Sequence, residues 1–288
     1  MKQNLSILIP TYNDPCATLV EELQRQAAVL GIAYEIIVGD DGSTDHQVLE
    51  TNRGIQRLPN CRLLATGRNQ GRAAIRNTLA QQAQYDWLLF IDSDMTICRN
   101  DYLQSYMKTE GEVIYGGIVV GAAIPGNLRS LWEKASEHQH TVEQRRKKPY
   151  FDFHTANFLI RRDLMLAHPF DLRYRHYGYE DVAFGKQLQQ EAIPIVHIDN
   201  PLSFEVFESN ADFIKKTEEG LRTLHQFRDE LQDYSRMLQF TRRHAWLLPL
   251  FHLLYIWAGP VAQRHLTGHH PTLAVFTLYR LGYFAHLR

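Results

Sequence analysis

Residues 87–94 read Trp-Leu-Leu-Phe-Ile-Asp-Ser-Asp, and the organisation of the rest of the chain can be worked out from them. Five successive apolar residues, rich in aromatic and branched types and too few for a helix, predict a buried strand over 87–91. Two carboxylates, Asp92 and Asp94, follow the strand directly. In an open α/β sheet the ligand crevice lies outside the carboxyl ends of the strands. We therefore expect the chemistry of this protein at this end of the strand.

A pair of acids one residue apart suits a hard divalent cation. Mg²⁺ or Mn²⁺ usually takes one or two protein carboxylates and completes its shell with substrate phosphate and water. Asp and Ser are also favoured turn residues, so the same three residues are compatible with a polar turn. The segments around the acids favour the cation site.

The composition indicates an acidic globular body followed by a basic, apolar C-terminal part. The 288 residues are 44% hydrophobic, which is enough for one large domain or for a domain with an appendage. Residues 234–288 contain six arginines and no acidic residue, whereas the first 233 residues carry 25 basic and 32 acidic residues, a net charge of −7. Three widely spaced cysteines predict neither a disulfide framework nor a zinc site, and no signal peptide opens the sequence. We therefore expect a cytoplasmic protein.

Strand and helix patterns alternate through the first ninety residues. Apolar runs over 5–9, 34–38 and 61–65 predict three strands before the strand at 87–91, and residues 17–30 and 72–84 have helical patterns. This alternation predicts an α/β fold with a mostly parallel sheet flanked by helices. The loops 10–14, 39–45 and 92–96 should converge on one edge of that sheet. Further along, 113–124 predicts one or two strands, and the four cations of 145–148 predict an exposed loop that is solvated or attracts a diphosphate or an anionic lipid surface.

Five blocks of sequence occur in a set order: SILIPTYN at 6–13, IIVGDDGSTD at 36–45, NQGRAAIRN at 69–77, DSD at 92–94 and GYED at 178–181. Together these blocks, spread over residues 4–210, resemble family 2 glycosyltransferases, an inverting family with the Rossmann-like GT-A fold. The resemblance implies a nucleotide-diphosphate sugar donor, in the first place a UDP-sugar, and a divalent metal, Mn²⁺ or Mg²⁺. It implies a glycan or a lipid-linked hydroxyl as the acceptor and no nucleic-acid partner.

The resemblance also assigns site residues. Asp94 would bind the metal directly, and Asp92 would face the ribose and contribute to the metal site. Arg76 and Asn77 would only tie down the preceding loop. Asn157 corresponds to the Asn of a segment that is often Gly-Gly-Asn in the family, and Thr155-Ala156 in place of the glycines leaves the choice of sugar open. The residues expected to contact the donor are Pro10, Thr11, Tyr12, Asn13, Asp40, Asp41, Arg68, Asn69, Gly71, Asp92 and Asn157.

Glu180 and Asp181 match the Glu-Asp pair of the family, in which the Asp is the usual general base. An inverting transfer needs a carboxylate on the face opposite the leaving diphosphate, where it takes the proton of the acceptor hydroxyl. The pair also opens a predicted helix, where acids stabilise the helix dipole without any catalysis. Some relatives place a His on the metal or diphosphate; His197 is our candidate for this third ligand, although its alternation with apolar residues equally suits a buried core histidine.

The C-terminal part, 211–288, is expected to be a helical extension of a catalytic domain over 1–210. Residues 211–240 predict one long helix with an apolar stripe. The apolar run 245–262 contains Pro249, His252 and Pro260, and a membrane-spanning helix needs about 20 uninterrupted apolar residues. Aromatic residues interleaved with Arg and His favour an amphipathic segment that holds the protein on the inner face of a membrane, with a homodimer contact as the alternative.

Parts of the sequence are also compatible with two other functions. Residues 92–96 also fit the D-x-D-x-T loop of haloacid-dehalogenase-like phosphohydrolases, but those enzymes usually carry it on the first strand, whereas here the acids of 39–41 come first. A non-catalytic sugar-nucleotide-binding protein is the other alternative. Binding measurements combined with a donor-hydrolysis assay would distinguish it from an enzyme.

Overall fold

The predicted strand β4, Trp87–Ile91, lies in the middle of a seven-stranded sheet whose order is β3-β2-β1-β4-β8-β6-β9. The computed structural model describes residues 2–151 and 153–287. The neighbours β1 (Asn4–Thr11), β2 (Ala33–Asp40) and β3 (Cys61–Ala65) run parallel to one another, and β1 runs parallel to β4. The alternating pattern of the first ninety residues therefore predicts this half of the sheet correctly.

Helices cover both faces of the sheet, which buries its apolar strands on each side. One core cluster contains α1 (Ala17–Ala28) and α4 (Tyr102–Lys108), and the other contains α3 (Arg72–Gln82) and α8 (Glu180–Gln190). In β4 the side chains from Leu88 to Ile91 are inaccessible to solvent. A strand buried on both faces needs a continuous apolar run, and this is the reason for the composition of residues 87–91.

The second half of the sheet is mixed. Strand β8 (Asn157–Arg161) pairs antiparallel with β4 and with β6 (Val113–Tyr115), and β9 (Ile195–His197) is parallel to β6. A separate three-stranded sheet consists of β5 (Met95–Ile97), β10 (Leu202–Phe204) and β7 (Ile118–Val120). The remaining helices of this body are α2 (His46–Arg53), α5 (Leu128–Ser136), α6 (Val142–Lys147) and α7 (Arg162–Ala167).

The prediction of an exposed loop over 145–149 is wrong. Residues 142–147 form α6, and Arg145 is buried with only 3% of its surface exposed. Its guanidinium donates hydrogen bonds to the backbone carbonyls of Tyr115, Gly116 and Ile198 at 3.0–3.3 Å. This arginine therefore ties the ends of β6 and β9 together, and only its neighbours form an exposed basic surface.

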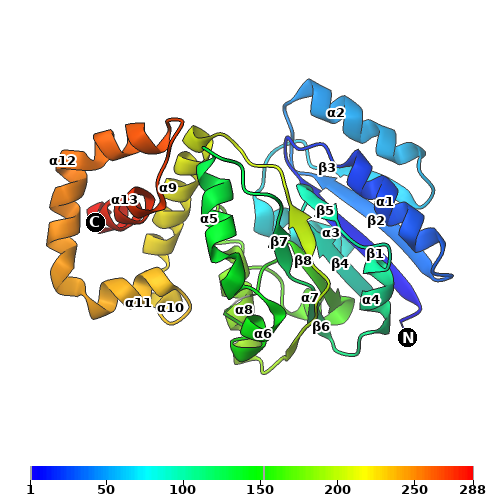
Figure 1. Ribbon diagram of the computed structural model, residues 1–288. Helices are drawn as coiled ribbons and strands as arrows, with labels where there is room; N and C mark the ends of the chain where they lie inside the picture. Colours follow the sequence, from blue (N-terminus) through cyan, green and yellow to red (C-terminus); the bar gives the residue numbers. More distant parts are fainter. Residues whose placement is uncertain (1, 152, 288) are drawn as a thin grey trace.

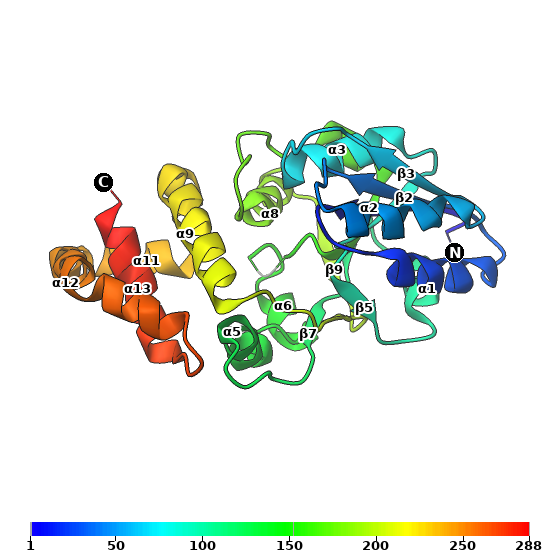
Figure 2. The ribbon, with the colours of Figure 1, turned by 90° about the horizontal axis from the view of Figure 1, so that it is seen from above.

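The C-terminal helices stand beside the sheet body, with α9 (Asn210–Gln226) nearest to it (Figures 1 and 2). The predicted single helix over 211–240 is wrong, because the chain turns after Phe227 and again at 232–235. It forms α10 (Arg228–Leu231) and α11 (Arg236–Arg243), and the Ser235 side chain caps α11 by accepting from the amide of Leu238. The apolar stripe is nevertheless buried, since Leu224, Phe227, Leu231 and Leu238 belong to one core cluster.

The apolar run after residue 245 is a continuous helix. Pro249 lies in the first turn of α12 (Leu248–Leu266), where no amide donor is needed, and Pro260 is accommodated inside the helix. With the preceding turn the segment Ala245–Leu266 has 22 residues, and its most apolar window of 18 residues has a mean hydropathy of 1.4 and is 6% buried. The expectation that Pro249, His252 and Pro260 interrupt it is wrong. Within residues 2–151 and 153–287 it is the one helix long and apolar enough to cross a membrane, by length and composition. It is followed by α13 (Leu273–His286), which packs against it.

Candidate functional site

Asn13 joins the first two loops at the carboxyl edge of the sheet. Its side-chain oxygen accepts hydrogen bonds from the amides of Thr44 and Asp45 at 2.7 and 2.9 Å, and its own amide donates to Ser43 Oγ at 2.7 Å. Asn13 adopts a left-handed backbone conformation with φ 53°, which Asn tolerates better than most residues. The loops after β1 and β2 are therefore held together as one surface.

Asp41 fixes the third loop to the same surface. Its two carboxylate oxygens accept hydrogen bonds from the amides of Gln70 and Gly71, each at 2.9 Å. Gly42, at φ +77°, lets the two loops touch, because a Cβ there would lie 2.4 Å from the carbonyl carbon of Arg68. Asp40 is also buried and accepts from the amide of Ser43 at 2.8 Å. Both acids thus act at least as anchors of the loops that are expected to bind the donor.

The other expected donor contacts differ in exposure. Tyr12 is 48% exposed, and Arg68 and Asn69 are exposed on a hollow of about 260 Å³ beside Ala73. Pro10 and Gly71 are partly buried, whereas Thr11 is buried and its carbonyl accepts from the amide of Asp41. The structure therefore brings these loop residues together and leaves three of their side chains open to a ligand.

Arg76 links the two acidic motifs directly. It comes from α3, is 1% exposed, and places its guanidinium 2.6 Å from Asp92 Oδ1 and 3.3 Å from Glu180 Oε1. Arg72, one turn earlier, lies 3.9 Å from Asp92 Oδ2. From the sequence, Arg76 was expected only to tie down a loop, and no role was expected for Arg72. A signal was present, since helix positions 72 and 76 lie on one face and that helix precedes the strand that ends at Asp92.

Asp94 has a surplus of negative charge around it. Burial, together with the charge of Asp92, raises the pKa of Asp94 to about 6, although Arg72 and Arg129 act in the opposite direction. Burial also raises the pKa of Asp14, and the charge of Asp92 acts in the same direction. Oδ2 of Asp14 has no hydrogen-bond partner among the described residues. A divalent cation would relieve this repulsion, and the carboxylate oxygens present are the ligands that Mg²⁺ and Mn²⁺ prefer.

Asp181 is the second residue of α8, which begins directly after Tyr179, a residue with a left-handed φ of 70°. Its Oδ2 is 3.0 Å from Nδ1 of His154, and its Oδ1 accepts from the amide of Val182 at 2.8 Å. Burial alone would raise the pKa of Asp181, but the hydrogen bond and charge of His154 and the Val182 amide hold it below its usual value. The neighbouring Glu180 is 5% exposed, and burial and the charge of Asp181 raise its pKa.

Asn157 does not face a ligand, so its assignment as a donor contact is wrong. The side chain is fully buried, and its oxygen accepts from the hydroxyls of Tyr102 and Tyr106 at 2.6 and 2.7 Å. Its nitrogen donates to the carbonyls of Gly117 and Asn200 at 2.7 and 3.0 Å. All four hydrogen-bonding positions of the amide are therefore used inside the protein.

His197 is likewise a core residue, and its assignment as a metal ligand is wrong. It is 3% exposed, its Nε2 lies 3.0 Å from the carbonyl oxygen of Pro149, and its Nδ1 lies 3.3 Å from the guanidinium of Arg145. Burial and the charge of Arg145 lower its pKa to about 4, so the ring is neutral near pH 7. Both ring nitrogens already have partners. Within residues 2–151 and 153–287 no three His, Cys, Asp or Glu side chains form a preassembled metal cluster.

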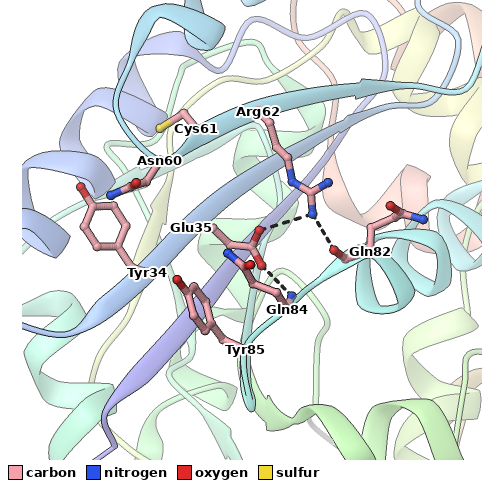
Figure 3. Close-up of a pocket in the computed structure, with 8 residues that line it drawn as sticks. All are labelled: Tyr34, Glu35, Asn60, Cys61, Arg62, Gln82, Gln84 and Tyr85. Atoms are coloured by element: carbon pink, nitrogen blue, oxygen red, sulfur yellow. Dashed lines mark hydrogen bonds and ion pairs between the residues drawn. The ribbon is translucent and has the colours of Figure 1, made fainter.

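A second cavity, of about 470 Å³, is lined by the residues drawn in Figure 3. Its lining comes from the starts of β2 and β3 and from the end of α3, so it is separated from the acidic motifs by the length of the strands. Glu35 at its centre accepts hydrogen bonds from Ser6 Oγ and from the amide of Gln84, and pairs with Arg62. Its charge is therefore satisfied internally.

Comparison with known sequences identifies the family. Residues 6–167, more than half of the chain, match the family model described as glycosyl transferase family 2. An uncharacterized glycosyltransferase of Haemophilus influenzae is 37% identical over 186 residues, which are 62% of this chain and 69% of that protein. Validoxylamine A glucosyltransferase of Streptomyces hygroscopicus is 25% identical over 288 residues, covering 85% of this chain and 62% of that enzyme.

Solved structures share the fold. The S. aureus TarS fragment 1–349 in complex with UDP-GlcNAc superposes with a TM-score of 0.54 at 16% identity, over 99% of this chain and 90% of that chain. The mannosyltransferase PcManGT of Pyrobaculum calidifontis, in complex with GDP-Man and Mn²⁺, gives a TM-score of 0.56 at 16% identity, over 99% and 86%. The sheet flanked by helices is thus the GT-A fold that the sequence predicts. The chain belongs to glycosyl transferase family 2 and is a glycosyltransferase.

Proposed function

We propose that this protein is a metal-dependent, inverting glycosyltransferase that moves a sugar from a nucleotide diphosphate, in the first place a UDP-sugar, to a hydroxyl of a glycan or a lipid-linked acceptor. One observation carries the proposal: Arg76 holds Asp92 and Glu180 on either side of one guanidinium. The motif expected at the metal and the motif expected at the acceptor are thus parts of one site. We further propose that residues 1–210 form the catalytic domain and 211–288 an extension.

The donor would lie on the surface made by the first three loops. Tyr12, Arg68 and Asn69 are exposed there, and Asn13, Asp40 and Asp41 hold that surface in shape. Asp94 is the better direct metal ligand of the two acids, because both oxygens of Asp92 already face arginines. A divalent metal bound there would neutralise the charge of the leaving diphosphate. Arg72 is half-exposed beside Asp92 and supplies a further cation on that side.

Asp181 is the proposed general base. Its pKa lies below the usual carboxyl value, so it is ionised and able to accept a proton at neutral pH. Single displacement requires the base on the side of the anomeric carbon away from the diphosphate. The position of Arg76 supports this arrangement. Its guanidinium lies between Asp92, on the side proposed for the diphosphate, and Glu180, the residue directly before Asp181.

The proposed location is the inner face of a membrane, with α12 in contact with the lipid. Figures 1 and 2 both show α12 on the side of the molecule away from the sheet. Trp257 of α12 and Trp246 in the turn before it are each 76% exposed, and Leu250, Leu253 and Ile256 of α12 are about half exposed. Arg242 and Arg243 precede this apolar surface, Arg264 lies in its last turn, and no acidic residue occurs after 233. Apolar aromatic surface combined with unopposed positive charge favours an anionic lipid surface. A homodimer through the same helix is the competing outcome.

The function is tested with a panel of UDP-glucose, UDP-galactose, UDP-N-acetylglucosamine and GDP-mannose. Thermal shift with and without Mn²⁺ identifies the donor that binds, and release of the nucleoside diphosphate measures turnover. We expect one donor to stabilise the protein only with the metal and to be hydrolysed slowly in the absence of acceptor. Binding without any release would instead favour a sugar-nucleotide-binding protein.

A further inference from the structure

His154 contacts the proposed base, yet it belongs to none of the five sequence blocks. It lies between α6 and β8, three residues before Asn157. Its Nδ1 is 3.0 Å from Asp181 Oδ2, and the imidazole is 40% exposed while the carboxylate is 22% exposed. A partly exposed ring therefore holds a more deeply placed carboxylate by a hydrogen bond.

This contact completes the orientation of the carboxylate. The Val182 amide holds Oδ1 at 2.8 Å, so His154 is the residue that fixes Oδ2. The terminal torsion of an Asp side chain is broad and roughly two-fold, and a single hydrogen bond restrains it poorly. With both oxygens held, the lone pairs that remain keep one direction.

We propose that His154 is a positioning residue for Asp181 in the transfer reaction, an inference that rests on the function proposed above. The Nδ1–H group of the imidazole donates to Oδ2 and holds the carboxylate toward the acceptor. In the step itself, the O–H bond of the acceptor breaks and its proton passes to Asp181. The oxygen forms a bond to the anomeric carbon while the bond from that carbon to the diphosphate breaks, and the electron pair leaves with the diphosphate.

The surroundings of the ring determine how the pair responds to pH. Among the described residues, the groups that face His154 or its partner include Asp181 and Glu180 of α8, Tyr115 of β6, Arg76 of α3, and His140, with Arg145 and Arg236 beyond it. Burial and the charge of His154 lower the pKa of His140 to about 4, so His140 is neutral at pH 7. Burial acts to raise the pKa of Asp181. The hydrogen bond from His154 and the charge of His154 are the main interactions that lower this pKa. Without His154, the pKa of Asp181 should rise.

Three variants test the proposal. His154→Ala removes the hydrogen bond, and His154→Asn keeps an N–H donor near the position of Nδ1 without an ionisable ring. His138→Asn makes the same change at an exposed histidine of the neighbouring segment and serves as the control. The assay is hydrolysis of the donor found in the panel, with water as acceptor, measured as release of nucleoside diphosphate across a range of pH. Thermal unfolding confirms that each variant is folded.

For His154→Ala we expect kcat to fall by about 10- to 100-fold with an unchanged KM for the donor, because small misplacements of a reacting group have effects of this size. In His154→Ala, the fall of kcat at acidic pH should begin at a higher pH than in the wild type. In His154→Asn this displacement should be smaller, and kcat should be higher than in His154→Ala. His138→Asn should match the wild type. A folded His154→Ala enzyme with wild-type kcat and acidic limb overturns the inference and leaves the proposed function intact. A wild-type protein that releases no nucleoside diphosphate from any donor overturns both.

Discussion

Replacement of Asp94 by Asn should stabilise the metal-free protein. The pKa of Asp94 is raised to about 6 from 3.8, mainly by burial and by the charge of Asp92, so the ionised group is unfavourable in the folded state. The cost is absent below both pKa values, grows as the pH rises between them and is complete above the folded-state value. Asn has nearly the same shape and no charge, and it removes this cost.

The magnitude follows from the two pKa values. A pKa that is raised by about two units lowers the free energy of unfolding by about 3 kcal/mol at pH 8, where Asp94 is ionised in both the folded and the unfolded state. At pH 4.5 the same pKa values give a cost of only about 1 kcal/mol, because folded Asp94 is then mostly protonated. Because Asp94 is partly accessible to water, screening makes these figures upper limits. The gain in the free energy of unfolding should therefore be larger at high pH.

Urea unfolding in the presence of EDTA, followed by fluorescence at both pH values, measures the gain. Asp101→Asn is the matched control: Asp101 is exposed, and its hydrogen bond with Arg99 lowers its pKa, so this change should give no stabilisation. Equal gains for Asp94→Asn at the two pH values, or a loss at pH 8, would refute the electrostatic reasoning. Mn²⁺ with UDP should then stabilise the wild type but not the variant; at 100 times the dissociation constant the effect is about 2.7 kcal/mol.

Three further outcomes are expected. Asp181→Asn should lower kcat by at least about 10²-fold with little change in donor affinity, which single-turnover and binding measurements separate. Arg76→Met leaves the buried carboxylate of Glu180 without its ion-pair partner and removes the nearer of the two arginines from the partly buried Asp92, so it should lower the free energy of unfolding by about 3–5 kcal/mol, whereas the exposed Arg53→Met should change it by no more than about 0.5 kcal/mol. Trp246→Ser and Trp257→Ser should each weaken sedimentation with anionic vesicles by about tenfold without changing the melting temperature. A wild-type protein that does not sediment with anionic vesicles and that forms a dimer in solution would contradict the membrane proposal.

The parallel half of the sheet could be predicted because its information is local. Strands at 4–11, 33–40 and 87–91 carry apolar runs, and each ends at a turn that contains polar residues. The antiparallel partner β8 gives a weaker signal, since its pairing with β4 joins residues about seventy positions apart. Long-range pairings of this kind are not encoded in the periodicity of one segment.

The candidate site was predicted as a set of residues but not as a set of contacts. Asn157 and His197 were assigned to ligands, although both are fully engaged inside the protein. Arg76 and His154 hold the acids in place, yet an isolated Arg or His in a sequence is more often a surface residue. Arg145 shows the same limit, because three backbone carbonyls remote in sequence make its burial favourable.

The C-terminal extension shows how capping overrides an apolar stripe. Positions 224–238 have the spacing of one continuous helix, but Ser235 caps a new helix and Phe227 stacks on Tyr174 with ring centroids 4.1 Å apart. The stripe correctly predicted burial and incorrectly predicted continuity. Conversely, Pro249 and Pro260 suggested interruption, and the first lies where a helix tolerates proline best.

Release of nucleoside diphosphate from the panel of nucleotide sugars tests the central proposal most directly. The wild type is compared in Mn²⁺ and in EDTA, alongside Asp94→Asn and Asp181→Asn. We predict release from one donor that requires the metal, that is lost in Asp94→Asn together with donor binding, and that is lost in Asp181→Asn with donor binding retained. Release that persists undiminished in EDTA or in both variants would contradict the assignment of the metal site and of the base.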